Sequence, residues 1–385
     1  MSKTRFNFYI FLTCLLVCSC GKNDRQEIVK ASSQEGELVF KVDTVKVDIG
    51  DQISYTYFRF DTYEEEGRFY FVKYQGSQHA LLFYDLEKRR LSKTIALEKA
   101  GPNGIGTLQN FHVHNLDSIF VFDAGNMKVL SEDAEVFFSM NLFSQLPQGV
   151  LIDFASPESK PFYSSKLNRV ILENSLRRNA TAEEKNQPFL AAINLESKSF
   201  ELIGPQHAPF MKNAKVGYGS YQGISFTNHE NLIFYNYPVS SKVYSYDLLT
   251  KENKAFNGNV SSIPNQASEF KNAASQAFIN AYRFETAIFY NIIYDPYKEL
   301  FYRLHRTGKP YDPAVRNTIQ NTRFYVSVFG REMNFIKEIE VAQNTYSQYT
   351  AFVGPEGLFL NASFKEFPLL EEDKMIFHVY DFSFQ

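Results

Sequence analysis

The stretch Asn110–Ser139, NFHVHNLDSIFVFDAGNMKVLSEDAEVFFS, contains four short segments separated by turn-forming residues. Phe111, Val113 and Asn115 alternate with polar positions, and Asn, Asp and Gly occur in the turns at 115–118, 123–126 and 132–133. Strands of about five residues joined by such turns predict an antiparallel meander of four strands. One meander cannot bury both of its faces, so we expect copies of it to lie beside it.

The rest of the chain has the same form. Four further meanders are predicted over 55–97, 150–203, 221–256 and 287–341, and three more strands over 348–384. One strand, Val39–Val47, has no partner nearby in the sequence. Three meanders share an aromatic strand that ends in Tyr-Asp-Leu or Asn-Leu-Glu, at Phe83–Leu86, Ile193–Glu196 and Ser245–Leu248. Asp is expected to cap the turn at such a junction.

Repeats of this length, each a four-stranded sheet, predict an all-β fold and a β-propeller. Five complete meanders, the last three strands and Val39–Val47 predict a six-bladed β-propeller of four-stranded antiparallel blades, with the last blade closed by the N-terminal strand. Closure would also remove an exposed sheet edge. The main alternative is a seventh blade in Gly258–Glu285. Apolar residues recur there at helical spacing, at Ala273, Ala274, Ala277, Phe278 and Ala281. That spacing favours a loop with a short helix.

The N-terminus predicts export. Lys3 and Arg5 precede the apolar run Phe6–Val17, which is too short to cross a bilayer as a helix and has the length of a signal-peptide core. After it, Ser19 stands directly before Cys20.

A small residue before a cysteine at this place resembles the lipobox of bacterial lipoproteins, in which the cysteine becomes the mature N-terminus and carries the lipid, palmitate included. Cys20 fits this pattern better than Cys18, because Cys18 follows the branched Val17. The alternative is an ordinary secretory signal in which the cysteines occur by chance.

These features divide the chain into a signal peptide at 1–19, a lipidated polar tether at 20–37 and a single β-propeller domain at 38–385. The lipid bilayer is the partner expected through Cys20, and the expected location is the cell envelope, at the outer membrane. All three cysteines (Cys14, Cys18 and Cys20) lie at or before the anchor, so no disulfide is expected in the domain. The formal charge falls from −3 to −5 once Lys3 and Arg5 are removed. No basic block occurs, so no nucleic-acid partner is expected.

The loop Gly101–Gly106, GPNGIG, resembles the Gly-x-Gly-Pro-Gly turn that often opens a blade in TolB-like six-bladed propellers, and departs from it at Asn103. With its lipobox, tether and aromatic-rich meanders, the chain resembles Bacteroidota cell-surface lipoproteins of unknown function that are grouped with those propellers. The resemblance covers most of the mature chain. It implies the fold and the envelope location and no particular activity.

Long connections are expected on one face of the propeller and tight turns on the other. The long ones span 98–109, 175–188, 204–220, 257–285, 305–322 and 365–373. Long loops usually persist where they have a role, so the long-loop face around the channel mouth is the predicted binding face. Aromatic, His and Arg side chains there suit glycans, peptides, protein partners or anionic ligands. The candidate binding residues are His207, Tyr218, Tyr221, His305, Arg306 and Arg316. The alternative is that they hold the long loops to the scaffold.

Catalytic motifs are weak. His112 and His114 lie on one face of a strand and could ligate a metal, although cross-strand packing is the simpler interpretation. The sequence contains no nucleophile elbow, zincin helix or P-loop, and a carboxylate pair for glycoside chemistry stays open. No catalytic residue, metal ligand or cofactor is predicted. The leading hypothesis is a non-enzymatic binding or scaffolding propeller. The alternatives are a surface enzyme acting on glycans or peptides at the channel mouth and a sensor that signals to a membrane partner.

Overall fold

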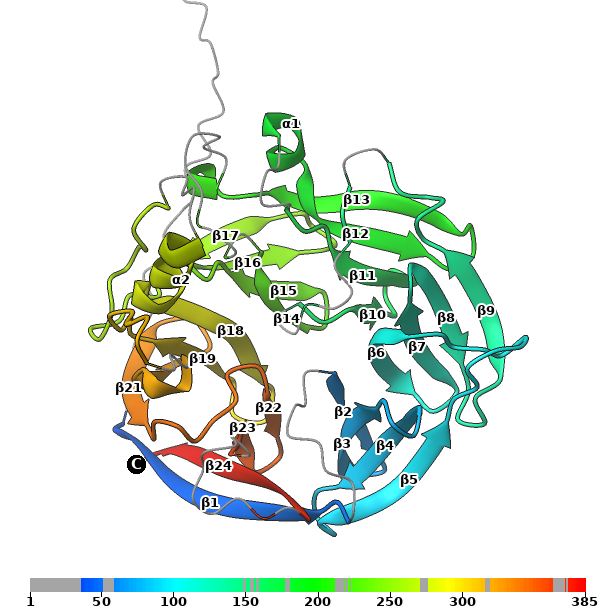
Figure 1. Cartoon of the computed structure of the whole chain (residues 1–385), viewed down its shortest axis with the longest axis horizontal. Coiled ribbons are helices and arrows are strands. Elements are labelled where there is room, and N and C mark those ends of the chain that lie inside the picture. The colour runs from blue at the N-terminus through cyan, green and yellow to red at the C-terminus, as the bar shows by residue number, and fades with distance from the viewer. Residues whose placement is uncertain are drawn as a thin grey trace, which may run out of the picture.

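The computed structural model describes residues 36–50, 59–147, 150–152, 156, 159–176, 181–211, 218, 221, 223–270, 276–315, 319–362, 371 and 373–385. Its strands form four four-stranded sheets and one eight-stranded sheet. Figure 1 shows these sheets arranged as a ring around a central space.

The four-stranded sheets follow one another along the chain, and each pairs its strands in sequence order. They are β6 (Leu108–Asn115), β7 (Ser118–Asp123), β8 (Asn126–Leu130) and β9 (Val136–Asn141); β10 (Phe162–Ser164), β11 (Arg169–Glu173), β12 (Pro188–Asn194) and β13 (Ser199–Gln206); β14 (Ser225–His229), β15 (Leu232–Asn236), β16 (Val243–Asp247) and β17 (Asn253–Phe256); and β18 (Ile288–Asp295), β19 (Leu300–Arg306), β20 (Phe324–Phe329) and β21 (Phe335–Val341). All neighbouring strands in these sheets are antiparallel, which confirms the predicted all-β meanders.

The eight-stranded sheet joins the two ends of the chain. Its order is β2 (Phe60–Glu65), β3 (Arg68–Gln75), β4 (Ala80–Asp85), β5 (Arg90–Ala96), β1 (Leu38–Asp48), β24 (Lys374–Phe384), β23 (Gly357–Asn361) and β22 (Ala351–Gly354). β1 pairs with β24 along its whole length, from Leu38 opposite Phe384 to Asp48 opposite Lys374. The expected pairing of the N-terminal strand with the last strands is therefore confirmed. β1 meets β5 only at Asp48 and Arg90, in a parallel pair.

The connection between β17 and β18 contains a helix, α2 (Gln276–Glu285), and no strand among its described residues. Ala277, Phe278 and Ala281 lie in α2, as their spacing predicted, and Ala273 and Ala274 lie outside the described residues. The other helical turns are α1 (Ala182–Lys185), η1 (Pro209–Met211) and η2 (Ile319–Asn321). Within the described ranges, no helix has the length and apolar character needed to cross a bilayer.

The tight turns are built as their sequences predict. Asp247 accepts hydrogen bonds from the backbone N–H groups of Leu249 and Thr250, at 2.7 and 3.0 Å. Lys251, which follows, has a φ of 62°, in the left-handed region. The same turn recurs at Asp85, Asn194 and Asp295. These side chains satisfy turn N–H groups, so their role is structural.

Aromatic side chains fill the space between neighbouring sheets. Phe234 of β15 packs edge-on against Phe301 of β19, with ring centroids 4.5 Å apart. Phe71 and Phe352 pack across the two halves of the eight-stranded sheet at 5.3 Å. The high Phe and Tyr content therefore supplies the core between the sheets. As Figure 1 shows, the first strand of each group (β2, β6, β10, β14, β18 and β22) lies nearest to the central space.

Candidate functional site

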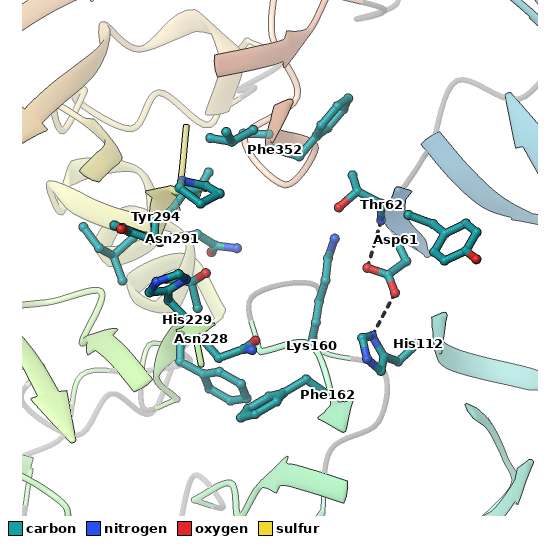
Figure 2. A pocket seen from close by; sticks show the side chains of 18 of the residues that line it. Asp61, Thr62, His112, Lys160, Phe162, Asn228, His229, Asn291, Tyr294 and Phe352 are labelled. Carbon is teal, nitrogen blue, oxygen red and sulfur yellow. Dashed lines mark hydrogen bonds and ion pairs between the residues drawn. The ribbon is translucent and has the colours of Figure 1, made fainter. Parts of the chain in front are cut away.

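A hollow of about 390 Å³ lies in the central space. Its walls come from β2, β6, β14, β18, β22 and the start of β10, so every innermost strand contributes side chains. Figure 2 shows these side chains converging from all sides. The volume is in the range of small-molecule sites.

An aspartate and a histidine from two neighbouring sheets pair at one wall. Asp61 of β2 accepts a hydrogen bond from His112 Nδ1 of β6 at 3.0 Å (Figure 2). It accepts a second from the Val113 N–H at 2.9 Å. Burial by itself would raise the pKa of Asp61, but the hydrogen bond and charge of His112, with the charge of Lys160, outweigh burial and leave the pKa below its ordinary value. Asp61 is therefore an ionised carboxylate, and His112 and the β6 backbone fix its position.

Lys160, two residues before β10, extends into the middle of the hollow (Figure 2). Its ammonium lies 3.1 Å from the centroid of the Phe60 ring. Among the described residues, the ammonium has neither a hydrogen bond nor an ion pair within 4.0 Å. Burial lowers the pKa of Lys160 to about 8, opposed in part by the charge of Asp61. The side chain is therefore still a cation at neutral pH, with no direct anionic partner in the described part of the chain.

Neutral hydrogen-bonding groups surround this cation. Thr62, Thr227, Asn228 and Asn291 line the hollow. The Asn291 carboxamide oxygen is buried and has no hydrogen-bond partner among the described residues. Asn291 lies where the pairing of β18 with β19 shifts register, between Phe289 and Ile292. Such a bulge redirects a side chain, and here Asn291 is turned toward the hollow (Figure 2).

Aromatic rings form the remaining walls. Phe69, Phe162, Phe226 and Phe352 line the hollow, and the His229 ring packs 4.4 Å from that of Tyr294. Rings of this kind offer flat apolar faces next to the polar groups. The hollow is thus suited to a ligand that has both polar and apolar surfaces.

Part of the lining of the hollow comes from the tight-turn face. Pro296 and Tyr297, in the turn between β18 and β19, belong to its lining. The Tyr297 hydroxyl donates to Glu64, near the end of β2, at 2.6 Å. Loop lengths had predicted the long-loop face as the binding face. This hollow is instead formed by side chains of the innermost strands, whose positions loop lengths do not reveal.

None of the predicted binding residues that the structure describes lines this hollow. His207 is buried and packs against Phe189 and Tyr237, with ring centroids 5.7 and 6.1 Å away. The Tyr218 hydroxyl is within 3.3 Å of Gln266 Nε2. Arg316 and Cys20 lie outside the described residues.

The structure brings Tyr221 and Arg306 together. Buried Arg306 donates to the Tyr221 hydroxyl at 3.3 Å and to the Arg283 carbonyl in α2 at 2.7 Å. His305 is also buried, and its Nε2 lies 2.8 Å from Glu338. These contacts match the alternative in which such residues hold the long loops. A ligand role for all six residues stays a prediction.

Asp61, Lys160 and Asn291 are not among the residues predicted from the sequence. His112 was considered there as a possible metal ligand, but the Asp61 that pairs with it lies 51 residues earlier in the chain. In the described ranges, no group of three or more His, Cys, Asp and Glu side chains is arranged to hold a metal ion.

Comparisons with known proteins agree with this architecture. The family model described as "Domain of unknown function (DUF4221)" matches residues 32–340. The crystal structure of a DUF4221 member from Bacteroides vulgatus superposes with a TM-score of 0.81 at 19% identity, covering 91% of this chain and 100% of that chain. A putative exported protein from Bacteroides fragilis gives 0.57 at 10% identity, with 90% and 95% covered. At these identities the likeness extends to the fold alone.

A weaker similarity involves the β-propeller domain of Cps50 (Swd1) from Myceliophteria thermophila. Its TM-score is 0.41 at 8% identity, over 86% of this chain and 97% of that domain. No curated protein matches the chain.

Proposed function

The chain belongs to the DUF4221 family, and we propose that it is a lipid-anchored, non-enzymatic binding protein of the cell envelope that holds a small polar ligand in its central hollow. The observation that carries this proposal is the convergence of polar side chains on one volume of about 390 Å³, from the innermost strands β2, β6, β14 and β18 and from Lys160 just before β10. A space that served only to pack the core would be apolar, because buried polar groups without partners are costly. The buried Asn291 oxygen, which has no hydrogen-bond partner among the described residues, is a group of this kind, and the Lys160 ammonium lies over the Phe60 ring rather than against a carboxylate.

The proposal includes a six-bladed propeller. We count β2–β5 as one blade and β22–β24 with β1 as another, because the single Asp48–Arg90 pair links these halves of the eight-stranded sheet. Six blades place six innermost strands around the channel, in agreement with the resemblance to TolB-like propellers.

The binding proposal can be tested by filling the hollow. Asn228→Trp would put an indole where the Asn228 amide faces Lys160, and Ser139→Trp would put one on the outer strand β9 as a control. We expect saturation-transfer NMR to detect at least one of D-glucose, D-galactose, D-glucuronate, D-galacturonate and alanylalanine at millimolar concentration. The signal should vanish in Asn228→Trp and persist in Ser139→Trp. If no probe binds, or if Asn228→Trp binds like the control, the proposal is wrong.

The anchor has its own test. Cys20→Ala should move the protein from the membrane fraction to the soluble fraction, because it removes the residue that would carry the acyl chains. Cys18→Ala is the matched control and should leave the protein on the membrane. Membrane retention of Cys20→Ala in cell fractionation would contradict the anchor and leave the binding proposal intact.

An enzyme acting on glycans or peptides is the second candidate. The Asp61–His112 pair favours it, because a carboxylate on Nδ1 orients an imidazole for proton transfer. The described lining contains no serine or cysteine that the imidazole could activate. Product formation from any bound glycan or dipeptide, lost in His112→Gln, would favour the enzyme over the binding protein.

A further inference from the structure

We propose that the ligand of the central hollow is an acidic sugar, a uronic acid or the uronic-acid end of a short glycan, whose carboxylate pairs with Lys160. This inference rests on the proposed function and narrows it from a small polar ligand to one chemical class.

Lys160 is a cation that forms no direct ion pair with a carboxylate among the described residues. The nearby carboxylate, Asp61, is already occupied, because its oxygens accept from His112 and from the backbone N–H groups of Thr62 and Val113. The other carboxylate of the lining, Glu64, accepts from Tyr297 at the rim. The ammonium rests instead on the Phe60 ring, at 3.1 Å from its centroid. A partly buried cation gains most from an anion that the ligand brings, because the surrounding walls exclude much of the water.

Neutral polar side chains lie around Lys160 in the hollow. The carboxamides of Asn228 and Asn291 and the hydroxyls of Thr62 and Thr227 line the hollow and offer both donors and acceptors. Sugar hydroxyls donate and accept in several directions around a ring, and Thr62, Asn228 and Asn291 lie on different sides of the hollow (Figure 2). The C–H faces of a sugar suit rings such as Phe352 and Tyr294.

Simpler ligands fit the hollow less well than an acidic sugar does. Inorganic phosphate or sulfate would satisfy Lys160 but would not span a hollow of about 390 Å³ to reach Asn291. A neutral sugar would satisfy the amides and leave the cation unpaired. A free amino acid would bring an ammonium of its own, whereas both lining carboxylates already have partners. A uronic acid supplies one carboxylate and several hydroxyls without adding a cation.

The experiment compares D-glucuronate with D-glucose, which has a CH₂OH group in place of the carboxylate. Isothermal titration with the mature chain should give glucuronate an affinity about tenfold to hundredfold higher, the range expected for one charge-assisted hydrogen bond. Lys160→Met should remove this preference, and Lys160→Arg should keep part of it. Lys254→Met, which removes an exposed lysine on the outer strand β17, should leave it unchanged. Melting temperatures within a few degrees of the unaltered protein would show that the variants are folded.

Other outcomes separate the two proposals. Equal affinity for glucuronate and glucose, or a preference that survives in Lys160→Met, overturns the acidic-sugar inference and leaves the binding function in place. Inorganic phosphate that binds as tightly as glucuronate also overturns it, because the site would then recognise an anion alone. If no sugar and no dipeptide binds, the proposed function fails as well.

Discussion

A chain that begins at residue 50, after β1, is expected to lose its folded monomeric state, whereas a chain that begins at residue 36 is expected to fold. β1 pairs with β24 at every position from Leu38 to Asp48 and bridges to β5 at Arg90. Leu38, Val45 and Val47 are buried. Burying three such side chains contributes about 5–9 kcal/mol, which is comparable to the whole stability of an ordinary domain, about 5–15 kcal/mol.

Removing β1 would also expose β24 as a new sheet edge. Edges of this kind pair with other chains, so the shortened protein should aggregate or elute as an oligomer. Size-exclusion chromatography and thermal melting of the two chains would measure the difference. A synthetic peptide of residues 36–50, added in trans, should restore part of the monomer by occupying the same edge. A monomeric 50–385 chain with an unchanged melting temperature would show that β1 does not hold the ring closed.

The pairing of β1 was predictable because the strands could be counted. Val39–Val47 had no local partner, and the C-terminal region 348–384 was one strand short of a meander. Turn chemistry was predictable for a related reason, since Asp247 and the residues it caps are neighbours in the chain. Features set by nearby residues, or by how many strands the chain has, were therefore accessible from the sequence.

The central hollow was not predictable in this way. Asp61 meets His112 only after two sheets have packed side by side, and Lys160 enters from the connection that precedes a third. Asn291 faces the hollow because of a register shift in β18, and the sequence of β18 does not predict that shift. His305 and Arg306 were predicted as binding residues because their side chains form strong hydrogen bonds. In the fold, both side chains form those hydrogen bonds with other groups of the protein. The sequence shows which side chains are polar. Only the folded ring of sheets shows which of them face the hollow and which of them hold loops.

The second large effect is expected at Arg303. This side chain of β19 is fully buried, and its guanidinium donates to the carbonyl oxygens of Ser241 at 2.6 Å and Gly258 at 2.5 Å. It packs 4.3 Å from the centroid of the Phe289 ring. Burial lowers the pKa of Arg303 to about 9, so the group is still charged at neutral pH. Arg303 therefore ties the sheet of β18–β21 to the connections on either side of the neighbouring strands β16 and β17.

Arg303→Met should lower the free energy of unfolding by about 2–4 kcal/mol. It leaves two carbonyl groups without their donor, at about 1–3 kcal/mol each, while removal of a buried charge offsets part of the loss. Arg303→Lys should lower the free energy of unfolding by less than Arg303→Met does. It should still lower it, because one ammonium cannot reproduce the planar fork that reaches both carbonyls. Arg331→Met is the matched control. Arg331 is exposed and pairs with Glu299 on the surface, so its loss should leave stability unchanged. Urea unfolding measures all three, and equal midpoints for Arg303→Met and Arg331→Met would mean that Arg303 does not tie the sheets together.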